Sequence, residues 1–308
     1  MPRFDFYLLN LSFQSPSGTT AEELGERVEF LATDCDSIRS NKEVIYRHDA
    51  IYETPMFEEF TFADIVYYGQ PALTRDQRNA LQTIIDQSKP TLCDNDFVIE
   101  LLSLNNAEEI NGLLCLFPVI DERIPSDCQI YCLRDWLQFH REYFVKFPPP
   151  RTEFAAQISP WFPNLHFNPV SVPSGLRGLH TDFQEIMKSI IHHLSALNDT
   201  YHPFFMQNRN LGGDGACDHL ENSFRGHQVQ IGASRDRNGL DELYFNFQDD
   251  RNGETRRCYC DLHTKFYQYF EYDNPSYQAK GNRIYFHQPI DGFLEGKLLI
   301  GRIGRHAG

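Results

Sequence analysis

Histidine, arginine and lysine side chains recur at two-residue spacing near the C-terminal end of this chain, between Cys258 and Gly308. Residues two apart in a β-strand share one face of the sheet. The alternation therefore predicts that His263 and Lys265 share a face, opposite Cys258 and Cys260. Two later runs extend this pattern, with Arg283, Tyr285 and His287 on one face of the second run and Arg302, Arg305 and His306 at the end of the third.

Such a set of side chains suits cleavage of a phosphodiester without a metal. The reaction needs a general base, a general acid and fixed cations for the charge that builds on phosphorus. Histidine can transfer protons near neutral pH, while arginine and lysine supply the cations. We expect His263 or His287 to be the base and His306 to be the acid or second proton carrier. The remaining roles go to Lys265, Arg283, Arg302 and Arg305 as phosphate ligands and to Tyr285 as a residue that stacks on a base or donates a hydrogen bond.

Two simpler interpretations compete with this one. Polar residues also alternate on an ordinary solvated sheet face, although such a face is expected to hold more Glu, Thr and Ser than His and Arg. The same strands can also form a binding surface in a non-catalytic interaction or accessory protein of a defence or toxin–antitoxin system. A catalytic site requires the histidines and arginines to converge within a few ångströms, whereas a binding surface can scatter them.

The last run of the chain also carries a family resemblance. The order R-I-Y-F-H, a glycine-bearing turn, K-L-L-I-G-R-I and a terminal R-H resembles the end of the RelE and barnase-like ribonuclease toxins, over about the last 80 residues. The resemblance implies a small sheet domain that cleaves RNA without a metal. The chain departs from the family in lacking a clear helix pair before the sheet and a barnase-type base carboxylate. The run also resembles uncharacterised bacterial proteins of toxin or phage-defence type, which implies a context and not a mechanism.

Composition and charge limit what the chain can do. A hydrophobic content of 41% and an aromatic content of 14% over 308 residues predict a folded protein of one large or two smaller domains. No apolar run approaches the ~20 residues of a membrane span, and no signal peptide is visible, so we expect a cytoplasmic protein with no membrane partner. The eight cysteines are scattered, which favours reduced, buried thiols.

The net charge of −15 is unevenly distributed. Residues 222–308 hold 12 Lys/Arg and 11 Asp/Glu, whereas residues 1–221 hold 16 and 32. This balance argues against a general nucleic-acid-binding surface, which is normally basic, but permits a confined cationic site with RNA as its substrate. We expect the acidic part to sense a trigger or to bind a regulatory or inhibitory protein partner.

The pattern of elements predicts an α+β fold. Residues 1–147 are expected to form a mixed α/β regulatory or sensor region. Its expected helices are Thr20–Leu31, capped by Thr19 or Thr20, and Leu73–Ser88, capped by Thr74. Residues 148–221 are expected to be a linker plus a long amphipathic helix. Residues 222–308 are expected to form an antiparallel sheet domain with five strands, from the runs HQVQIGA, ELYFNF, CYCDLHTKF, RIYFH and KLLIGRI, with a hairpin turn at Asn252-Gly253.

Metal-binding alternatives are weaker. One zinc site is conceivable from Cys217, His219, Cys258 and Cys260, but the C-x-H and C-x-C spacings are tight for tetrahedral ligation. A second group, Asp94, Asp96 and Glu100, lacks the Glu-x-Lys that a metal-dependent nuclease would add, so we interpret Asp94 as a helix cap. We therefore expect neither a metal nor another cofactor.

Overall fold

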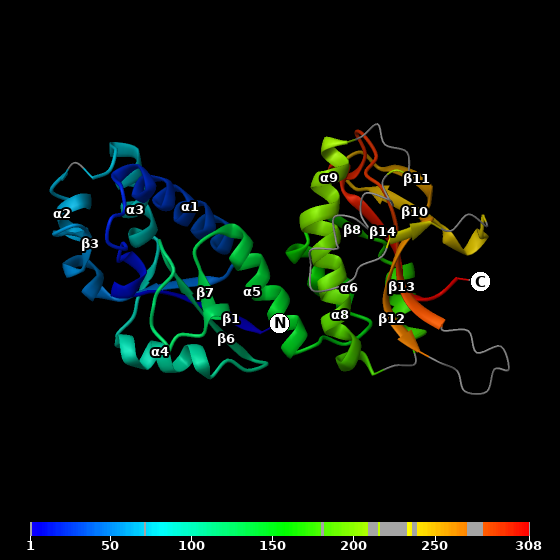
Figure 1. Ribbon diagram of the computed structural model, residues 1–308, viewed down its shortest axis with the longest axis horizontal. Helices are drawn as coiled ribbons and strands as arrows, with labels where there is room; N and C mark the ends of the chain where they lie inside the picture. Colours follow the sequence, from blue (N-terminus) through cyan, green and yellow to red (C-terminus); the bar gives the residue numbers. More distant parts are fainter. Residues whose placement is uncertain are drawn as a thin grey trace. The chain divides into compact units, whose positions relative to one another are not determined.

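The chain folds into two compact units, Met1–Glu142 and Tyr143–Gly308, in a computed structural model (Figure 1). The structure describes residues 2–70, 72–179, 182–208, 215, 233–235, 239–269 and 280–307. By sequence the first unit holds 11 Lys/Arg and 25 Asp/Glu, and the second holds 17 and 18. The acidic excess thus belongs almost entirely to the first unit. Within the described residues, no helix has the length and apolar character needed to cross a membrane.

A five-stranded parallel sheet forms the centre of the first unit. Its order is β5 (Lys89–Pro90), β2 (Val44–Arg47), β1 (Arg3–Leu8), β6 (Glu109–Leu114) and β7 (Gln129–Ile130). The chain winds from β1 to one edge and then from β6 to the other, which is a doubly wound α/β topology. Parallel sheets are covered on both faces, and accordingly Phe6, Leu8 and Leu113 have no exposed surface.

The helices of this unit begin where local capping chemistry predicts. They are α1 (Ala21–Ser40), α2 (Phe62–Val66), α3 (Arg75–Asp86), α4 (Asn95–Ser103) and α5 (Leu133–Lys146), and a small hairpin joins β3 (Pro55–Phe57) to β4 (Phe60–Thr61). Thr74 caps α3 as expected, and Thr20, one of the two threonines expected to cap the first helix, caps α1. Helix α1 continues to Ser40, beyond its expected end at Leu31. Asp94 caps α4 by accepting a hydrogen bond from the Phe97 backbone N–H at 2.8 Å, and Asp96 instead pairs with Arg123. These two carboxylates therefore have structural partners.

The main sheet of the second unit has the order β8 (Leu165–Phe167), β14 (Leu298–Arg305), β13 (Lys280–His287), β12 (Leu262–Tyr269) and β9 (Ala233–Arg235). All neighbours are antiparallel except β8, which runs parallel to β14. The predicted α+β class, with a mixed N-terminal region and a small, largely antiparallel C-terminal sheet, is confirmed. Of the predicted first strand, HQVQIGA, only Ala233 falls within the described residues.

Two details of the expected sheet were wrong. Strands β10 (Tyr244–Asp249) and β11 (Glu254–Tyr259) form a separate hairpin, closed at Asn252-Gly253 as predicted. The run CYCDLHTKF is not one strand, because it turns a corner at Cys260, whose backbone N–H donates to Leu243 O at 2.9 Å. The main sheet instead gains β8, which precedes the long helix in sequence.

Helices cover one face of this sheet and the hairpin covers the other (Figure 1). The helices are α6 (Phe154–Ile158), α7 (Ser171–Arg177), α8 (Phe183–Ala196) and α9 (His202–Gln207), with a π-helical turn over Leu197–Tyr201. The Tyr201 ring lies 5.2 Å from that of Phe286 on the helical side. On the other side Leu243, Phe247 and Leu299 pack in one core cluster. Segment 143–208 thus contributes a strand and four helices to the second unit, where we expected a linker with one helix.

Candidate functional site

Strand register brings six of the predicted site residues onto one face of β12, β13 and β14: His263, Lys265, Arg283, Tyr285, His287 and Arg302. His263 pairs with Tyr285, which pairs with Arg302 on its other side. In the next row Lys265 pairs with Arg283. Directly paired residues point to the same face of a sheet, so these side chains share the face that the hairpin partly covers.

The three predicted histidines do not converge. His287 pairs with Leu299 near the start of β14, whereas His306 follows the end of that strand. Seven residues of extended chain separate Leu299 from His306, a distance of roughly 20 Å. His263 lies between these two ends. At this distance no single phosphodiester can contact both His287 and His306. Alternation predicts the face on which a side chain lies but not its position along the sheet.

The central row belongs to the core of the unit. Tyr285 has no exposed surface and His263 is 5% exposed, with 5.3 Å between their ring centroids. The Tyr285 hydroxyl accepts a hydrogen bond from the Ala307 backbone N–H at 2.8 Å. A buried ring held in this way cannot stack on a base in this conformation. Arg302, the third member of the row, donates from Nη1 to Glu242 Oε2 at 3.0 Å.

Cationic side chains remain accessible at one end of the sheet. Lys265 is exposed and its stem lies over Gly281, where an added Cβ would come 2.9 Å from Lys265 Cγ. Arg283 is half-buried beside it, and His306 is exposed after the end of the neighbouring strand. We call Lys265, Arg283 and His306 the cationic end. Neither Lys265 nor Arg283 forms an ion pair with another described residue, in contrast to Arg302.

Arg305 lies on the opposite face from this group. It pairs with Asn282, while the adjacent Arg283 pairs with Gly304. Neighbouring positions in a strand alternate between faces, so Arg305 and Arg302 do not share one face. The two arginines that we predicted to hold one phosphate together are therefore divided between the two sides of the sheet.

The other end of the sheet holds a histidine pair that the sequence did not reveal. Leu299 pairs with His287 on one side and with His166 of β8 on the other. Two strand spacings separate the two histidines, about 10 Å. Burial is the main cause that lowers the pKa of His166, and nearby Lys297 lowers it further. The short alternating run around His166 was visible in the sequence, but only the parallel pairing of β8 relates it to His287.

His287 has a defined tautomer in its neutral form. Its Nδ1 lies 2.7 Å from the Gln288 carbonyl oxygen. A carbonyl only accepts hydrogen bonds, so Nδ1 carries the proton and Nε2 is left as the proton acceptor. This arrangement suits a general base, but the cations of the cationic end are at the far end of the sheet.

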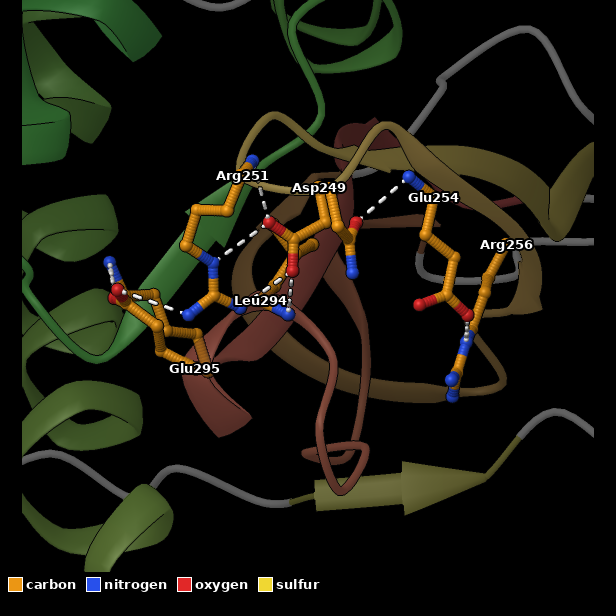
Figure 2. Close-up of polar contacts among 8 residues, drawn as sticks. Asp249, Arg251, Glu254, Arg256, Leu294 and Glu295 are labelled. Carbon is orange, nitrogen blue, oxygen red and sulfur yellow. Dashed lines mark hydrogen bonds and ion pairs between the residues drawn. The ribbon is translucent and has the colours of Figure 1, made fainter.

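A charged network stabilises the hairpin against the loop between β13 and β14 (Figure 2). The Asp249 carboxylate accepts hydrogen bonds from Arg251 Nη2 at 2.6 Å, Arg251 Nε at 2.9 Å and the Leu294 backbone N–H at 2.9 Å. These donors, led by the Arg251 guanidinium, hold the pKa of Asp249 well below its usual range. Arg251 also pairs with Glu295. Because Leu294 and Glu295 both have positive φ, of 48° and 57°, Asp249 fixes a strained turn.

The zinc alternative gains no support from the described part of the chain. Cys217 and His219 lie outside the described residues. Cys258 and Cys260 are buried between the hairpin and the main sheet, and burial raises the pKa of both thiols. The described residues contain no group of three or more His, Cys, Asp or Glu side chains placed to hold a metal ion.

Comparison with known proteins adds no relative. No protein-family model, curated protein sequence or solved structure matches the chain.

Proposed function

We propose that the chain is a non-catalytic interaction protein whose second unit binds the phosphate backbone of RNA at the cationic end. The observation that supports this proposal best is the strand register. It places Lys265 beside Arg283 on neighbouring strands, with no ion pair to another described residue, while it separates the histidines. A binding surface needs only the cations, since phosphate contacts supply most sequence-independent affinity for nucleic acid.

The charge distribution supports a confined contact. The first unit has an excess of 14 acidic residues and repels a polyanion, whereas the second is close to neutral. RNA would therefore bind where cations concentrate, at the cationic end. The acidic unit suits a basic regulatory or inhibitory partner. The toxin-like C-terminal run favours a setting in a bacterial toxin or anti-phage defence system in the cytoplasm.

Binding of a labelled single-stranded RNA to the full-length protein, followed by fluorescence anisotropy across a salt series, tests the proposal. We expect the double variant Lys265→Ala/Arg283→Gln to weaken binding at least tenfold and to lower the salt slope by about 1 for each cation removed. The matched control is Arg256→Gln, which removes a partly exposed arginine of the hairpin that pairs with Glu254. Equal losses in the control and the double variant, or no binding by the wild type, would overturn the proposal.

Metal-independent cleavage of RNA is the second candidate. One observation favours it: His306 is exposed at the same end of the sheet as Lys265 and Arg283. In this case His306 is the proton-transfer residue and the two cations hold the phosphate. We then expect cleavage in EDTA that His306→Ala abolishes without loss of RNA binding. His287→Ala, at the far end of the sheet, is expected to keep full activity. If the RNA stays intact with the wild type and with both variants, the cleavage candidate is excluded and RNA binding is the one proposed function left.

A further inference from the structure

A buried polar group occupies the helix-covered face of the main sheet, opposite the cationic end. Asn282 pairs directly with Arg305 across β13 and β14. Thr264, on β12, pairs with Ile284 and therefore shares a face with Asn282, two positions from Ile284 on β13. Phe286 follows on the same face and contacts Tyr201 of the helical layer. This alternation places Thr264, Asn282 and Arg305 under the helices and not under the hairpin.

These side chains are withdrawn from solvent. Thr264 has no exposed surface and Asn282 is 1% exposed, while Arg305 is half-buried. The end of β14 is thus the more open side of the group. A ligand that reaches Arg305 from this end would next meet Asn282, which is the directly paired residue on β13.

Several polar atoms of the group have no hydrogen-bond partner among the described residues. They are Thr264 Oγ1, both Nδ2 and Oδ1 of Asn282, and Nε and Nη2 of Arg305. Folded proteins leave few buried polar atoms unpaired, and a charged guanidinium is the most costly group to leave in this state. Asn282 and its directly paired neighbour Arg305 share this property, as does Thr264 on the same face of the next strand, which indicates a missing partner and not an isolated packing fault.

The donors define what that partner is. A guanidinium offers N–H groups in a fixed fork that matches the oxygens of an oxyanion, and the amide and hydroxyl add donors beside it. A cation is excluded by the charge of Arg305, and a neutral ligand would leave that charge uncompensated. A phosphate group has enough oxygens to accept from all three side chains.

We propose that Arg305, Asn282 and Thr264 form a binding site for a phosphate group, free or carried by a nucleotide. The site lies on the other face of the sheet from Lys265 and Arg283, so it does not depend on the proposed binding of RNA. A ligand bound at this site would stabilise the second unit, so the stability of the unit would depend on the concentration of the ligand.

Thermal unfolding and isothermal titration calorimetry of the full-length protein test this site with three probes. The probes are inorganic phosphate, adenosine monophosphate and acetate, each compared with sodium chloride at equal ionic strength. We expect phosphate to raise the Tm with saturable dependence on concentration, because a ligand that binds only the native state stabilises it. Tighter binding of adenosine monophosphate than of phosphate identifies a nucleotide site, and equal binding identifies a phosphate site. A response to acetate alone would overturn the assignment to phosphate.

Single-residue variants test whether phosphate binds at Arg305. Arg305→Gln is expected to weaken phosphate binding at least tenfold, since it removes the charge-assisted hydrogen bonds. Arg256→Gln is the matched control, because it removes an arginine of the hairpin that pairs with Glu254 and belongs to neither proposed site, and it is expected to bind phosphate like the wild type. If Arg305→Gln does not fold, Arg305→Lys keeps the charge, loses the fork and is expected to bind more weakly.

One result would show that the group is only an imperfectly packed part of the core. In that case Asn282→Leu raises the Tm without any ligand, and neither phosphate nor adenosine monophosphate produces a saturable signal with the wild type. Loss of phosphate binding in Arg283→Gln but not in Arg305→Gln would likewise overturn the site. RNA binding at the cationic end is measured separately by fluorescence anisotropy, so failure of the phosphate site is distinguished from failure of the proposed function.

Discussion

Asp249 of the hairpin and Arg305 of the main sheet are charged residues of the second unit, and they differ in their partners. The Asp249 carboxylate accepts hydrogen bonds from Arg251 and from the Leu294 backbone N–H. Nε and Nη2 of Arg305 have no hydrogen-bond partner among the described residues. The contrast separates a charge that completes the fold from one that still offers donors to a ligand. Burial or charge alone would not have distinguished the two residues.

Removal of Asp249 is expected to give the largest loss of stability. Asp249→Ala deletes the acceptor of two Arg251 donors and frees the strained turn at Leu294. We expect the Tm of the second unit to fall by about 5 °C or more, measured by circular dichroism or differential scanning calorimetry. Asp250→Ala is the matched control, because Asp250 is adjacent but exposed. A similar Tm for both variants would show that the Asp249 network does not stabilise the fold.

The same network predicts a pH dependence. The pKa of Asp249 is lowered in the folded state, so its contribution to stability is present above the unfolded pKa of about 3.9 and is lost as pH falls below it. Urea unfolding from pH 6 downwards is expected to show wild-type stability that approaches that of Asp249→Asn under acid conditions. A constant difference between the two proteins throughout the series would contradict this assignment.

Packing of α7 against β14 is the next test, because this strand leads directly to Arg305. A Cβ on Gly175 would lie 2.5 Å from the Ile303 carbonyl oxygen, whereas one on Gly178 would lie 3.4 Å from its nearest neighbour, the Gly175 carbonyl oxygen. Gly175→Ala is therefore expected to destabilise the second unit by about 1–3 kcal/mol. Gly178→Ala is expected to change stability by less than about 0.5 kcal/mol. Urea unfolding measures both, and a tolerant Gly175→Ala would show that α7 can move away from the strand.

Features set by local chemistry were predictable from the sequence. Thr74 and Asp94 cap their helices through hydrogen bonds to backbone groups three residues away, and Asn252-Gly253 closes its hairpin with a glycine of positive φ. The face shared by His263 and Lys265 also followed from alternation. Each of these features depends on residues that are close together in the chain, where spacing alone determines which groups meet.

Features set by distant pairing were not predictable. The parallel contact of β8 with β14 joins His166 to Leu299 across more than a hundred residues. The distance between His287 and His306 depends on the register of two strands, which alternation does not fix. The unpaired donors of Arg305 depend on every element packed around it. Candidate residue types were therefore visible in the sequence, but their grouping into sites was not.

Substitution of Tyr285 has the smallest expected effect on stability and is the most discriminating test of that grouping. Its hydroxyl accepts from the Ala307 backbone N–H inside the core, so Tyr285→Phe removes one buried hydrogen bond and keeps the ring. We expect a loss of about 1 kcal/mol in the free energy of unfolding, with RNA affinity unchanged. Urea unfolding and fluorescence anisotropy on the same preparation check both halves. A variant with normal stability but weaker RNA binding would move Tyr285 from the core to the binding surface, and the cationic end would then have to include the central row of the sheet.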